Sequence, residues 1–393
     1  MTKARVVTVS SGAAGAVRRG HPWIWRAGVA RASDALGTGE VVEVRASDDT
    51  PLGQGIWDDT SPIAIRLYAR TVSPKLDAAA IAGGVERAVE RRAFLAASSQ
   101  TTAYRLCHGE GDRVPGVVID RYDDVAVVRL DGAAIATWLP DLAPRMWRLL
   151  EPLGLVSLVH RADKRGDEVK LEALFGRLPP DTITVRENGM AMVVDLAHGQ
   201  KTGAFLDQRD NRARVKELAA GRRVLNLFSY AGGFSTAAAL GGALHVTSVD
   251  VAHAAHLSAE LSMRANGIDP SAHAFVTADA FAFLAAAKAK GQTWDLIVSD
   301  PPSFAPSEKA KPRALAAYRK LHGACAAVLG PGGILCAASC SSHVALEEFA
   351  ATLDDVALGR ADLSLAGLFG PPADHPTVAG WPEGRYLKFA VLR

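Results

Sequence analysis

The stretch RVLNLFSYAGGFSTAAALGGALHVTSVD, residues 223–250, decides the fold. It runs from an apolar segment through a glycine-bearing turn and an alanine-rich segment to a second apolar run that ends in Asp250. This order of strand, loop, helix, strand and acid is typical of a Rossmann-like half-unit. Such a unit binds an adenosine-bearing cofactor, because its glycines let backbone N–H groups approach and its acid bonds the ribose hydroxyls. The alternative is a βαβ turn with a purely structural role.

The glycine spacing in this stretch indicates which cofactor it binds. A dinucleotide-binding turn reads GxGxxG, so that a pyrophosphate can sit on the N-terminus of the next helix. Here Gly232 and Gly233 are adjacent with no third glycine at the required offset, while Asn226 and Ser229 add polar groups. We therefore expect a cofactor without phosphates that carries an amino-acid head, and S-adenosylmethionine is such a molecule.

Composition limits the class of protein. A chain of 393 residues predicts two or three domains, each with its own core. The formal net charge of +2 allows a local nucleic-acid-binding patch without requiring one. The four cysteines form no C-x-x-C pair, which argues against zinc and disulfides and favours a reducing compartment. Without a signal-like or membrane-spanning apolar run, we expect a cytoplasmic protein with no membrane partner.

Residues 1–72 contain short alternating runs separated by Gly, Pro and Asp, a spacing that predicts a small β barrel. Arg18 and Arg19 could neutralise phosphates while Trp23 stacks on an unpaired base, so this cluster is a candidate RNA-binding surface. The alternative is that the tryptophans of this cluster fill the barrel core and the arginines form a solvated rim.

Residues 73–185 show no recognisable chemistry. Residues 76–97 predict one long amphipathic helix, and residues 117–130 predict a hairpin. We expect a strand–helix domain that spaces its neighbours.

Residues 186–393 contain the groups from which a catalytic site can be built. A loop at residues 200–212 surrounds Phe205 with polar side chains. Beyond Asp250, a third predicted strand ends at Asp279, which can bond the adenine amino group. Ligands bind outside the carboxyl ends of parallel strands, so both acids should face one crevice.

The fourth predicted strand ends in Asp300-Pro301-Pro302. The two prolines hold the backbone extended and remove N–H donors, which fixes where the Asp300 carboxylate points. We expect this carboxylate to hold a planar nitrogenous ring by hydrogen bonds, with Phe304 stacked on that ring. A proline-rich strand exit without chemistry is the alternative.

The fifth predicted strand leads into Cys340. A cysteine flanked by hydroxyls at a strand's carboxyl end is placed for nucleophilic attack if its thiolate is stabilised. Cys336, inside the same strand, is expected to be a small buried hydrophobe. An inert thiol is the alternative for Cys340, but three signals at one crevice edge favour the nucleophile.

Over nearly its whole length the chain resembles the large-subunit ribosomal RNA methyltransferases that make 5-methylcytosine. The strings that carry the resemblance, in order, are GHPWIW, GEGDRVPGVVIDRY, KTGAFLDQRDNR, LNLFSYAGGFS, SDPPSF, SCSSH and GRYLK. The resemblance implies an α/β protein with an N-terminal PUA-like β barrel (residues 1–72) and a central α+β domain (residues 73–185). The C-terminal domain (residues 186–393) is then a Rossmann-like class I methyltransferase on a mostly parallel seven-stranded sheet.

The same resemblance implies roles for single residues. Cys340 is then the nucleophile and Asp300 the group that hydrogen-bonds the cytosine. S-adenosylmethionine is expected to contact Phe205, Asn226, Phe228, Ser229, Tyr230, Gly232, Asp250, Asp279 and Asp300. The RNA is expected to contact Pro301, Pro302, Phe304, Arg18, Arg19 and Trp23. Ribosomal RNA is the implied partner, and a homodimer is the implied assembly.

The residue types suit that chemistry, with one departure. A thiolate that attacks C6 of cytosine makes C5 reactive towards a methyl donor. Broader RNA cytosine-C5 enzymes resemble D-x-P-C at the motif that holds Asp300, whereas this chain has Ser303 after the prolines. Release by a second thiol is therefore not expected, and the base that removes the C5 proton is unassigned. Direct methylation of a ring nitrogen or exocyclic amine, and a non-catalytic RNA-binding protein, are the alternatives.

Overall fold

The computed structural model describes residues 5–33, 35–162 and 170–393, which form two compact units. The first unit comprises Met1–Asp181, Leu196–Gly203 and Ala373–Gly384. The second unit comprises Thr182–Asp195, Ala204–Pro372 and Arg385–Arg393. Within the described ranges, no helix is both long enough and apolar enough to cross a bilayer. The domain limits expected at residues 72 and 185 stay a prediction.

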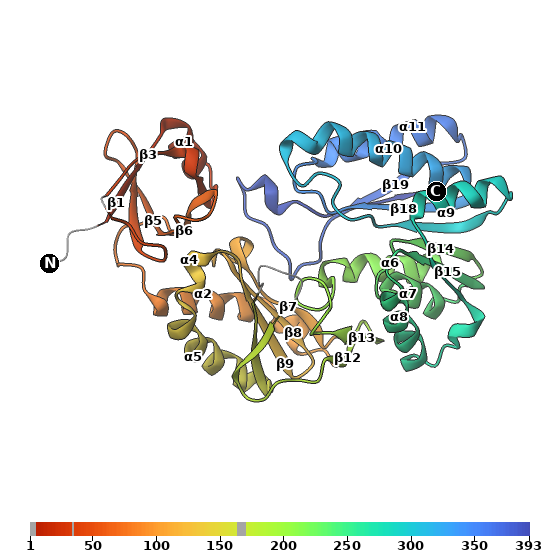
Figure 1. The fold of residues 1–393 in the computed structure, drawn as a ribbon, viewed down its shortest axis with the longest axis horizontal. Coiled ribbons are helices and arrows are strands. Elements are labelled where there is room, and N and C mark those ends of the chain that lie inside the picture. The colour runs from red at the N-terminus through yellow and green to blue at the C-terminus, as the bar shows by residue number, and fades with distance from the viewer. Residues whose placement is uncertain (1–4, 34, 163–169) are drawn as a thin grey trace. The chain divides into compact units, whose positions relative to one another are not determined.

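The N-terminal part of the first unit is a six-stranded sheet (Figure 1). Its strands are β1 (Val6–Val9), β2 (Trp23–Trp25), β3 (Val29–Ala32), β4 (Val41–Arg45), β5 (Pro51–Trp57) and β6 (Ile63–Ala69), in the order β2-β6-β5-β4-β1-β3. Val42 and Val44 are buried while their neighbours in β4 are only partly covered, the period of two expected of a strand with one face on a core. A helix that the sequence did not reveal, α1 (Ser11–Arg18), begins after Ser10, whose hydroxyl accepts the Ala13 N–H.

The rest of the first unit is a five-stranded sheet with four helices. The strands are β7 (Ala103–His108), β8 (Val117–Tyr122), β9 (Val125–Leu130), β10 (Ser157–Ala162) and β11 (Lys170–Phe175), and the helices are α2 (Ala78–Glu90), α3 (Ala93–Ala96), α4 (Ala133–Ala136) and α5 (Leu139–Leu150). The predicted hairpin is present as β8 and β9, which pair antiparallel. The single helix predicted over residues 76–97 is wrong, because α2 ends at Glu90 and α3 follows as a separate element.

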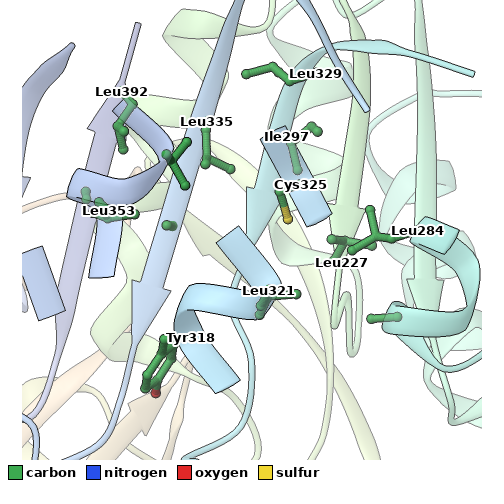
Figure 2. Packing of buried hydrophobic residues seen from close by; sticks show 14 of the residues in the cluster. Leu227, Leu284, Ile297, Tyr318, Leu321, Cys325, Leu329, Leu335, Leu353 and Leu392 are labelled. Atoms are coloured by element: carbon green, nitrogen blue, oxygen red, sulfur yellow. The ribbon is translucent and has the colours of Figure 1, made fainter. Parts of the chain in front are cut away.

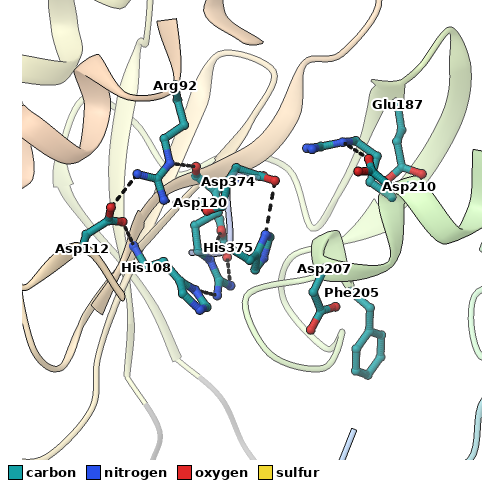
Figure 3. Close-up of polar contacts among 12 residues, drawn as sticks. Arg92, His108, Asp112, Asp120, Glu187, Phe205, Asp207, Asp210, Asp374 and His375 are labelled. Atoms are coloured by element: carbon teal, nitrogen blue, oxygen red, sulfur yellow. Dashed lines mark hydrogen bonds and ion pairs between the residues drawn. The ribbon is translucent and has the colours of Figure 1, made fainter. Parts of the chain in front are cut away.

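Arg92 lies between α2 and α3, and its buried contacts explain why the helix ends there (Figure 3). Its side chain is 1% exposed, and its guanidinium donates to the Asp112 carboxylate at 2.7 Å. It also donates to the backbone carbonyls of Ala88, Arg105 and Asp374 at 2.9, 3.1 and 2.6 Å. A buried charge is tolerated only when it is paired and hydrogen-bonded, so this network of contacts outweighs continuation of the helix.

A second buried network holds residues 196–203 in the first unit. The Arg105 guanidinium donates to both oxygens of Asp120, at 2.8 and 3.0 Å. The Thr202 hydroxyl donates to Asp120 Oδ2 at 2.5 Å and lies 2.9 Å from the Tyr122 hydroxyl. Thr202 belongs to the KTG part of the loop that the sequence associated with the cofactor, and here its hydroxyl is used within the first unit.

The second unit is built on a seven-stranded sheet, preceded by a hairpin. The hairpin strands are β12 (Thr182–Glu187) and β13 (Met190–Asp195); the sheet strands are β14 (Arg223–Leu227), β15 (His245–Asp250), β16 (Ala274–Thr277), β17 (Trp294–Ser299), β18 (Leu329–Ser339), β19 (Leu365–Phe369) and β20 (Lys388–Leu392). The helices are α6 (Arg209–Leu218), α7 (Gly233–Leu240), α8 (His253–Ala265), α9 (Ala280–Ala289), α10 (Lys311–Ala327) and α11 (Leu346–Gly359).

The strand order of this sheet, β16-β15-β14-β17-β18-β20-β19, places the site. The first five strands are parallel, and β20 runs antiparallel to both of its neighbours. The chain moves outward from β14 to β16 and then returns to β17 on the other side of β14. Ligands of open α/β sheets bind at such a reversal, outside the carboxyl ends of the strands.

Apolar layers cover both faces of the sheet, which explains the nearly continuous apolar strands. One layer contains Leu225, Leu227 and Ile297 together with residues of α10 such as Leu321 (Figure 2). The opposite layer contains Val224 and its neighbours on α6 and α7. Successive residues of β14 thus enter different layers, as the alternation of a strand requires.

Candidate active site

The loop after β14 has an unusual backbone. Phe228 and Tyr230 have φ angles of 58° and 44°, and Gly232 has a φ of 74°. Non-glycine residues adopt this left-handed region only at a cost of about 1–3 kcal/mol each, and they cluster at ligand sites. Gly232 also packs closely on α8, because a Cβ atom there would lie 2.4 Å from the Cβ of Ala259. The loop therefore requires glycine at position 232.

Asp250 fixes this loop from the end of β15. Its Oδ2 accepts the Tyr230 N–H at 2.8 Å, and its Oδ1 accepts the Ala252 N–H at 2.9 Å. An ionised carboxylate offers about four acceptor positions, so two remain in principle for the hydroxyls of a ribose. The same side chain can thus shape the loop and bind a nucleoside.

Asn226 and Ser229 each have a buried side-chain oxygen atom in this loop region. Asn226 is 1% exposed and donates through Nδ2 to the Ser235 hydroxyl at 2.8 Å, which in turn lies 2.7 Å from the Ser248 hydroxyl. This chain of bonds joins β14, α7 and β15. Across the described residues, neither Asn226 Oδ1 nor Ser229 Oγ has a hydrogen-bond partner. Buried polar atoms of this kind are satisfied by a ligand or by water, so the loop fits a polar cofactor.

Phe205 contacts this loop, whereas Asp279 lies after β16. The Phe205 ring packs edge-on against Tyr230, with ring centroids 5.3 Å apart. Its carbonyl accepts Arg212 Nη2 at 2.9 Å, and Arg212 is paired with Glu187 at 2.6 and 2.5 Å. Asp279 is exposed and caps α9 by accepting the Ala282 N–H at 2.9 Å. Phe205 therefore has a fixed position beside the cofactor loop, whereas Asp279 lies open to solvent.

Asp300, after β17, is held by a residue far away in the sequence. Gln208 donates through Nε2 to Asp300 Oδ2 at 2.9 Å. The Gln208 oxygen accepts Asn211 Nδ2 at 2.6 Å, which orients the amide so that its NH₂ group faces the carboxylate. Next to Gln208, Asp207 accepts the hydroxyl of Tyr386 at 2.7 Å. One oxygen of Asp300 is thus oriented by the protein before any substrate arrives.

Cys340 follows the last residue of β18, and its thiol is partly buried. Its Sγ lies 3.9 Å from the carbonyl oxygen of Pro301. Ser341 joins the two loops, because its hydroxyl lies 3.1 Å from Ser303 Oγ and 3.0 Å from the Tyr318 hydroxyl. The thiol is therefore fixed beside the Asp300-Pro301-Pro302 segment, as the strand pattern predicted.

Two aromatic rings pack against each other beside this region. Phe304 lies against Tyr318, with ring centroids 4.9 Å apart. Burial raises the pKa of Tyr318, and a charge on Cys340 would raise it further, while its hydroxyl contacts act in the opposite direction. Pro301 is buried and Pro302 is exposed. Stacking of Phe304 on a substrate ring stays a prediction.

The other three cysteines differ sharply from Cys340. Cys107, Cys325 and Cys336 are fully buried, and burial raises the pKa of each thiol to about 12. None of these three carries a thiolate near neutral pH, which supports the sequence-based assignment of Cys336 as a buried hydrophobe.

Lys388 is a charged residue of this region that the sequence analysis missed. It is 2% exposed, and its Nζ donates to the carbonyls of Ser341 and Val344 at 2.6 and 2.8 Å. Burial lowers the pKa of Lys388 to about 8. A lysine at the start of the apolar strand KFAVL was the available signal. Gln208 was visible only as one member of a polar loop and Ser341 only as a hydroxyl beside Cys340, while Tyr318 gave no signal.

Three of the candidate RNA-binding residues, Arg18, Arg19 and Trp23, lie in the first unit. Arg18 and Arg19 are exposed, and Arg18 is 4.0 Å from Asp48. Trp23 is partly buried and donates through Nε1 to Glu110 at 2.7 Å. The arginines therefore occupy a solvated surface and the indole of Trp23 is anchored, while contact with RNA stays a prediction.

Comparisons with known proteins agree with this geometry. A model of S-adenosylmethionine-dependent methyltransferases matches residues 155–379, and a model of PUA-like domains matches residues 7–70. A ribosomal RNA large subunit methyltransferase of Deinococcus radiodurans is 38% identical, with 96% of this chain and 94% of that protein covered. A ribosomal RNA large subunit methyltransferase I of Klebsiella pneumoniae is 34% identical, with 95% and 94% covered.

A solved structure is also similar over the full length. It is a crystal structure of a methyltransferase complexed with SAH (S-adenosylhomocysteine), with a TM-score of 0.87, 26% identity, and 98% of this chain and 99% of that chain covered. The predicted α/β fold, with a class I methyltransferase sheet and an N-terminal PUA-like domain, is thereby confirmed. The predicted cofactor, S-adenosylmethionine, is confirmed by the same family match.

Proposed function

Because the chain belongs to the S-adenosylmethionine-dependent ribosomal RNA large subunit methyltransferases, we propose that it methylates C5 of a cytosine through a covalent bond to Cys340. The observation that carries this proposal is the position of the Cys340 thiol, 3.9 Å from the carbonyl oxygen of Pro301, the residue that follows Asp300. A thiol at this place can reach a ring that Asp300 binds.

Different residues of the second unit would bind the cofactor and the target base. Asp250 and the loop at residues 228–232 would hold S-adenosylmethionine, which supplies the methyl group from its sulfonium. Asp300, oriented by Gln208, would accept a hydrogen bond from the exocyclic amine of cytosine, and one from N3–H once N3 takes up a proton as charge develops on the ring. The target base would have to leave its stack to reach these groups.

Cys340 would carry the covalent step. Its thiolate forms a bond to C6, the electron density moves to C5, and C5 takes the methyl group. Loss of the C5 proton then expels the thiolate as the S–C6 bond breaks, which regenerates the enzyme. Cys325 and Cys336 are excluded as a second releasing thiolate, because burial raises the pKa of each to about 12.

RNA carrying 5-fluorocytosine tests the proposal directly. A base can remove a proton from C5 but cannot remove fluorine in the same way. A methylated adduct should therefore accumulate as a stable protein–RNA conjugate attached at Cys340. The measurement is a denaturing gel followed by mass spectrometry of the linked peptide. Rapid turnover of ordinary RNA without any conjugate on the fluorinated RNA would contradict the covalent route.

The variant Cys340→Ala separates this route from direct transfer to a nitrogen. A covalent enzyme should lose activity by roughly 10⁴-fold or more, because no other group supplies the nucleophile. Binding of S-adenosylmethionine, measured by calorimetry, should stay unchanged. Retention of most activity by Cys340→Ala would favour direct transfer.

We also propose that ribosomal RNA is recognised through the exposed Arg18 and Arg19 and through Trp23, in a cytoplasmic homodimer. Charge-reversal of Arg18 and Arg19 should weaken RNA binding and reduce its salt dependence. Sedimentation velocity of the full chain tests the dimer.

A further inference from the structure

Lys388 occupies a position where a lysine is rarely found. It is the first residue of β20, lies 2% exposed, and is followed by apolar residues. Lysines are almost never fully buried unless they are paired. Because β20 runs antiparallel to β18, Lys388 pairs with Ser339, the residue that precedes Cys340. The fold thus brings a buried cation to the base of the loop that carries the candidate nucleophile.

The partners of the Lys388 ammonium are neutral. Its Nζ donates to the carbonyl oxygens of Ser341 and Val344, at 2.6 and 2.8 Å. Both carbonyls belong to the turn that follows Cys340, so the ammonium holds this turn in one conformation. Carbonyl oxygens satisfy N–H donors without cancelling the positive charge, and the charge therefore acts on its surroundings.

We propose that Lys388 is a positioning residue that fixes the Cys340 loop and favours the thiolate form of Cys340. The inference rests on the proposed function in so far as Cys340 is the nucleophile. A thiolate near a buried ammonium is stabilised, because the interaction between opposite charges is strong where water is excluded.

The charged groups around this pair act in both directions. Burial lowers the pKa of Lys388 to about 8, while charges on Cys340 and Glu348 raise it. Glu348, on α11, is engaged by the Ala345 N–H at 2.8 Å and by Lys311 at 3.3 Å. Tyr318 on α10 also interacts with a charge on Cys340. Asp300 precedes Pro301, whose carbonyl oxygen lies 3.9 Å from Cys340 Sγ, so the neighbouring loop also carries a carboxylate.

The test measures the reactivity of the thiol, not methyl transfer. Iodoacetamide forms an S–C bond with the thiolate and releases iodide, so the alkylation rate reports the thiolate fraction. The rate at Cys340 is followed by mass spectrometry between about pH 6 and pH 10, where thiols and a buried lysine titrate. Cys107, Cys325 and Cys336 do not interfere in the folded protein, because burial raises the pKa of each to about 12.

Lys388→Met should shift the alkylation profile to higher pH and slow the reaction at neutral pH by roughly tenfold, the effect of one pH unit. Lys388→Arg should keep the fast reaction, since a guanidinium stays charged throughout this pH range. Lys290→Met, which removes an exposed lysine next to α9, is the matched control and should leave the profile unchanged.

Several results would overturn the inference. One is a Lys388→Met profile that coincides with the wild-type profile, and another is equal loss of reactivity in Lys388→Met and Lys388→Arg, which indicates a structural role alone. If Lys388→Met does not fold, the comparison of Lys388→Arg with the wild type tests the inference. The wild-type alkylation profile should bend near pH 8, where Lys388 loses its proton, whereas the Lys388→Arg profile should not. Coincident profiles would then contradict the inference.

The two proposals fail in different ways. If wild-type protein forms no conjugate with 5-fluorocytosine RNA while the Lys388 variants shift the alkylation profile, the covalent mechanism is wrong and the effect of Lys388 on the thiol stands. If the conjugate forms and the profiles coincide, the covalent mechanism stands and Lys388 has no electrostatic role.

Discussion

The carboxyl edge of the seven-stranded sheet has two halves that are built differently. The cofactor half, at the ends of β14, β15 and β16, is held by short-range bonds. Asp250 binds the N–H of Ala252, two residues away, and that of Tyr230, 20 residues away. The other half, at the ends of β17 and β18 and the start of β20, is the one we propose to bind the target nucleobase, and we call it the base half. It is held by long-range bonds.

Sequence separations make the contrast clear. Gln208 and Asp300 are 92 residues apart, Lys388 and Ser341 are 47 apart, and Tyr386 and Asp207 are 179 apart. The cofactor half can therefore form within one supersecondary unit, whereas the base half requires the whole sheet. We expect substitutions in the cofactor half to affect cofactor affinity alone and substitutions in the base half to affect turnover.

Asp250→Ala should give the largest effect in the cofactor half. It removes a charged acceptor for the ribose and frees the Tyr230 N–H, so the Kd for S-adenosylmethionine should rise by roughly a hundredfold, as for loss of hydrogen bonds to a charged group. Calorimetry measures the affinity. Asp269→Ala, which removes an exposed capping acid before β16, is the matched control and should leave the Kd unchanged. An unchanged Kd in Asp250→Ala would break the comparison.

Gln208→Leu tests the base half. The amide that orients Asp300 Oδ2 is lost, so kcat should fall by roughly tenfold while the Kd for S-adenosylmethionine stays the same. Gln292→Leu, in the exposed turn before β17, serves as the control. A fall in cofactor affinity equal to the fall in kcat would show that the two halves are not separate.

Tyr386→Phe should have the smallest effect. Asp207 is 3% exposed and loses the hydroxyl that donates to its Oδ2, so the free energy of unfolding should drop by about 1 kcal/mol. Urea denaturation followed by circular dichroism measures it. A drop of this size with unchanged cofactor affinity would sharpen the distinction, because Tyr386 belongs to the base half.

The same contrast explains which residues of the site could be predicted from the sequence. The loop between β14 and α7, Asp250 and Asp279 lie at or within two residues of a strand end, so a local pattern of strand, turn and acid is enough to predict their positions. Asp300 and Cys340 also follow predicted strands, so their positions at one edge of the parallel sheet could be predicted, while their roles stay a prediction. Gln208 orients Asp300, and Lys388 holds the turn after Cys340. No local sequence pattern reveals that the segments carrying these two residues lie beside those loops.

Two local predictions show the same limit. The helix predicted over residues 76–97 was interrupted because Arg92 enters a buried network that includes the carbonyl of Asp374, 282 residues away. Thr202 lies close to Phe205 in the sequence, yet its hydroxyl is used by Asp120 and Tyr122. In both places a tertiary contact determines the local structure, and neither hydrophobic periodicity nor the position of a loop in the sequence predicts that contact.

The position of β20 has a consequence for biosynthesis. This strand comes after β19 along the chain but inserts between β18 and β19, so the sheet has a gap until β20 has emerged from the ribosome. Nascent chains that end before Lys388 should therefore expose the edges of β18 and β19 to chaperones. We expect Cys340 to reach its native surroundings only after β20 has paired, because Lys388 of that strand holds the carbonyls of Ser341 and Val344 in the following turn.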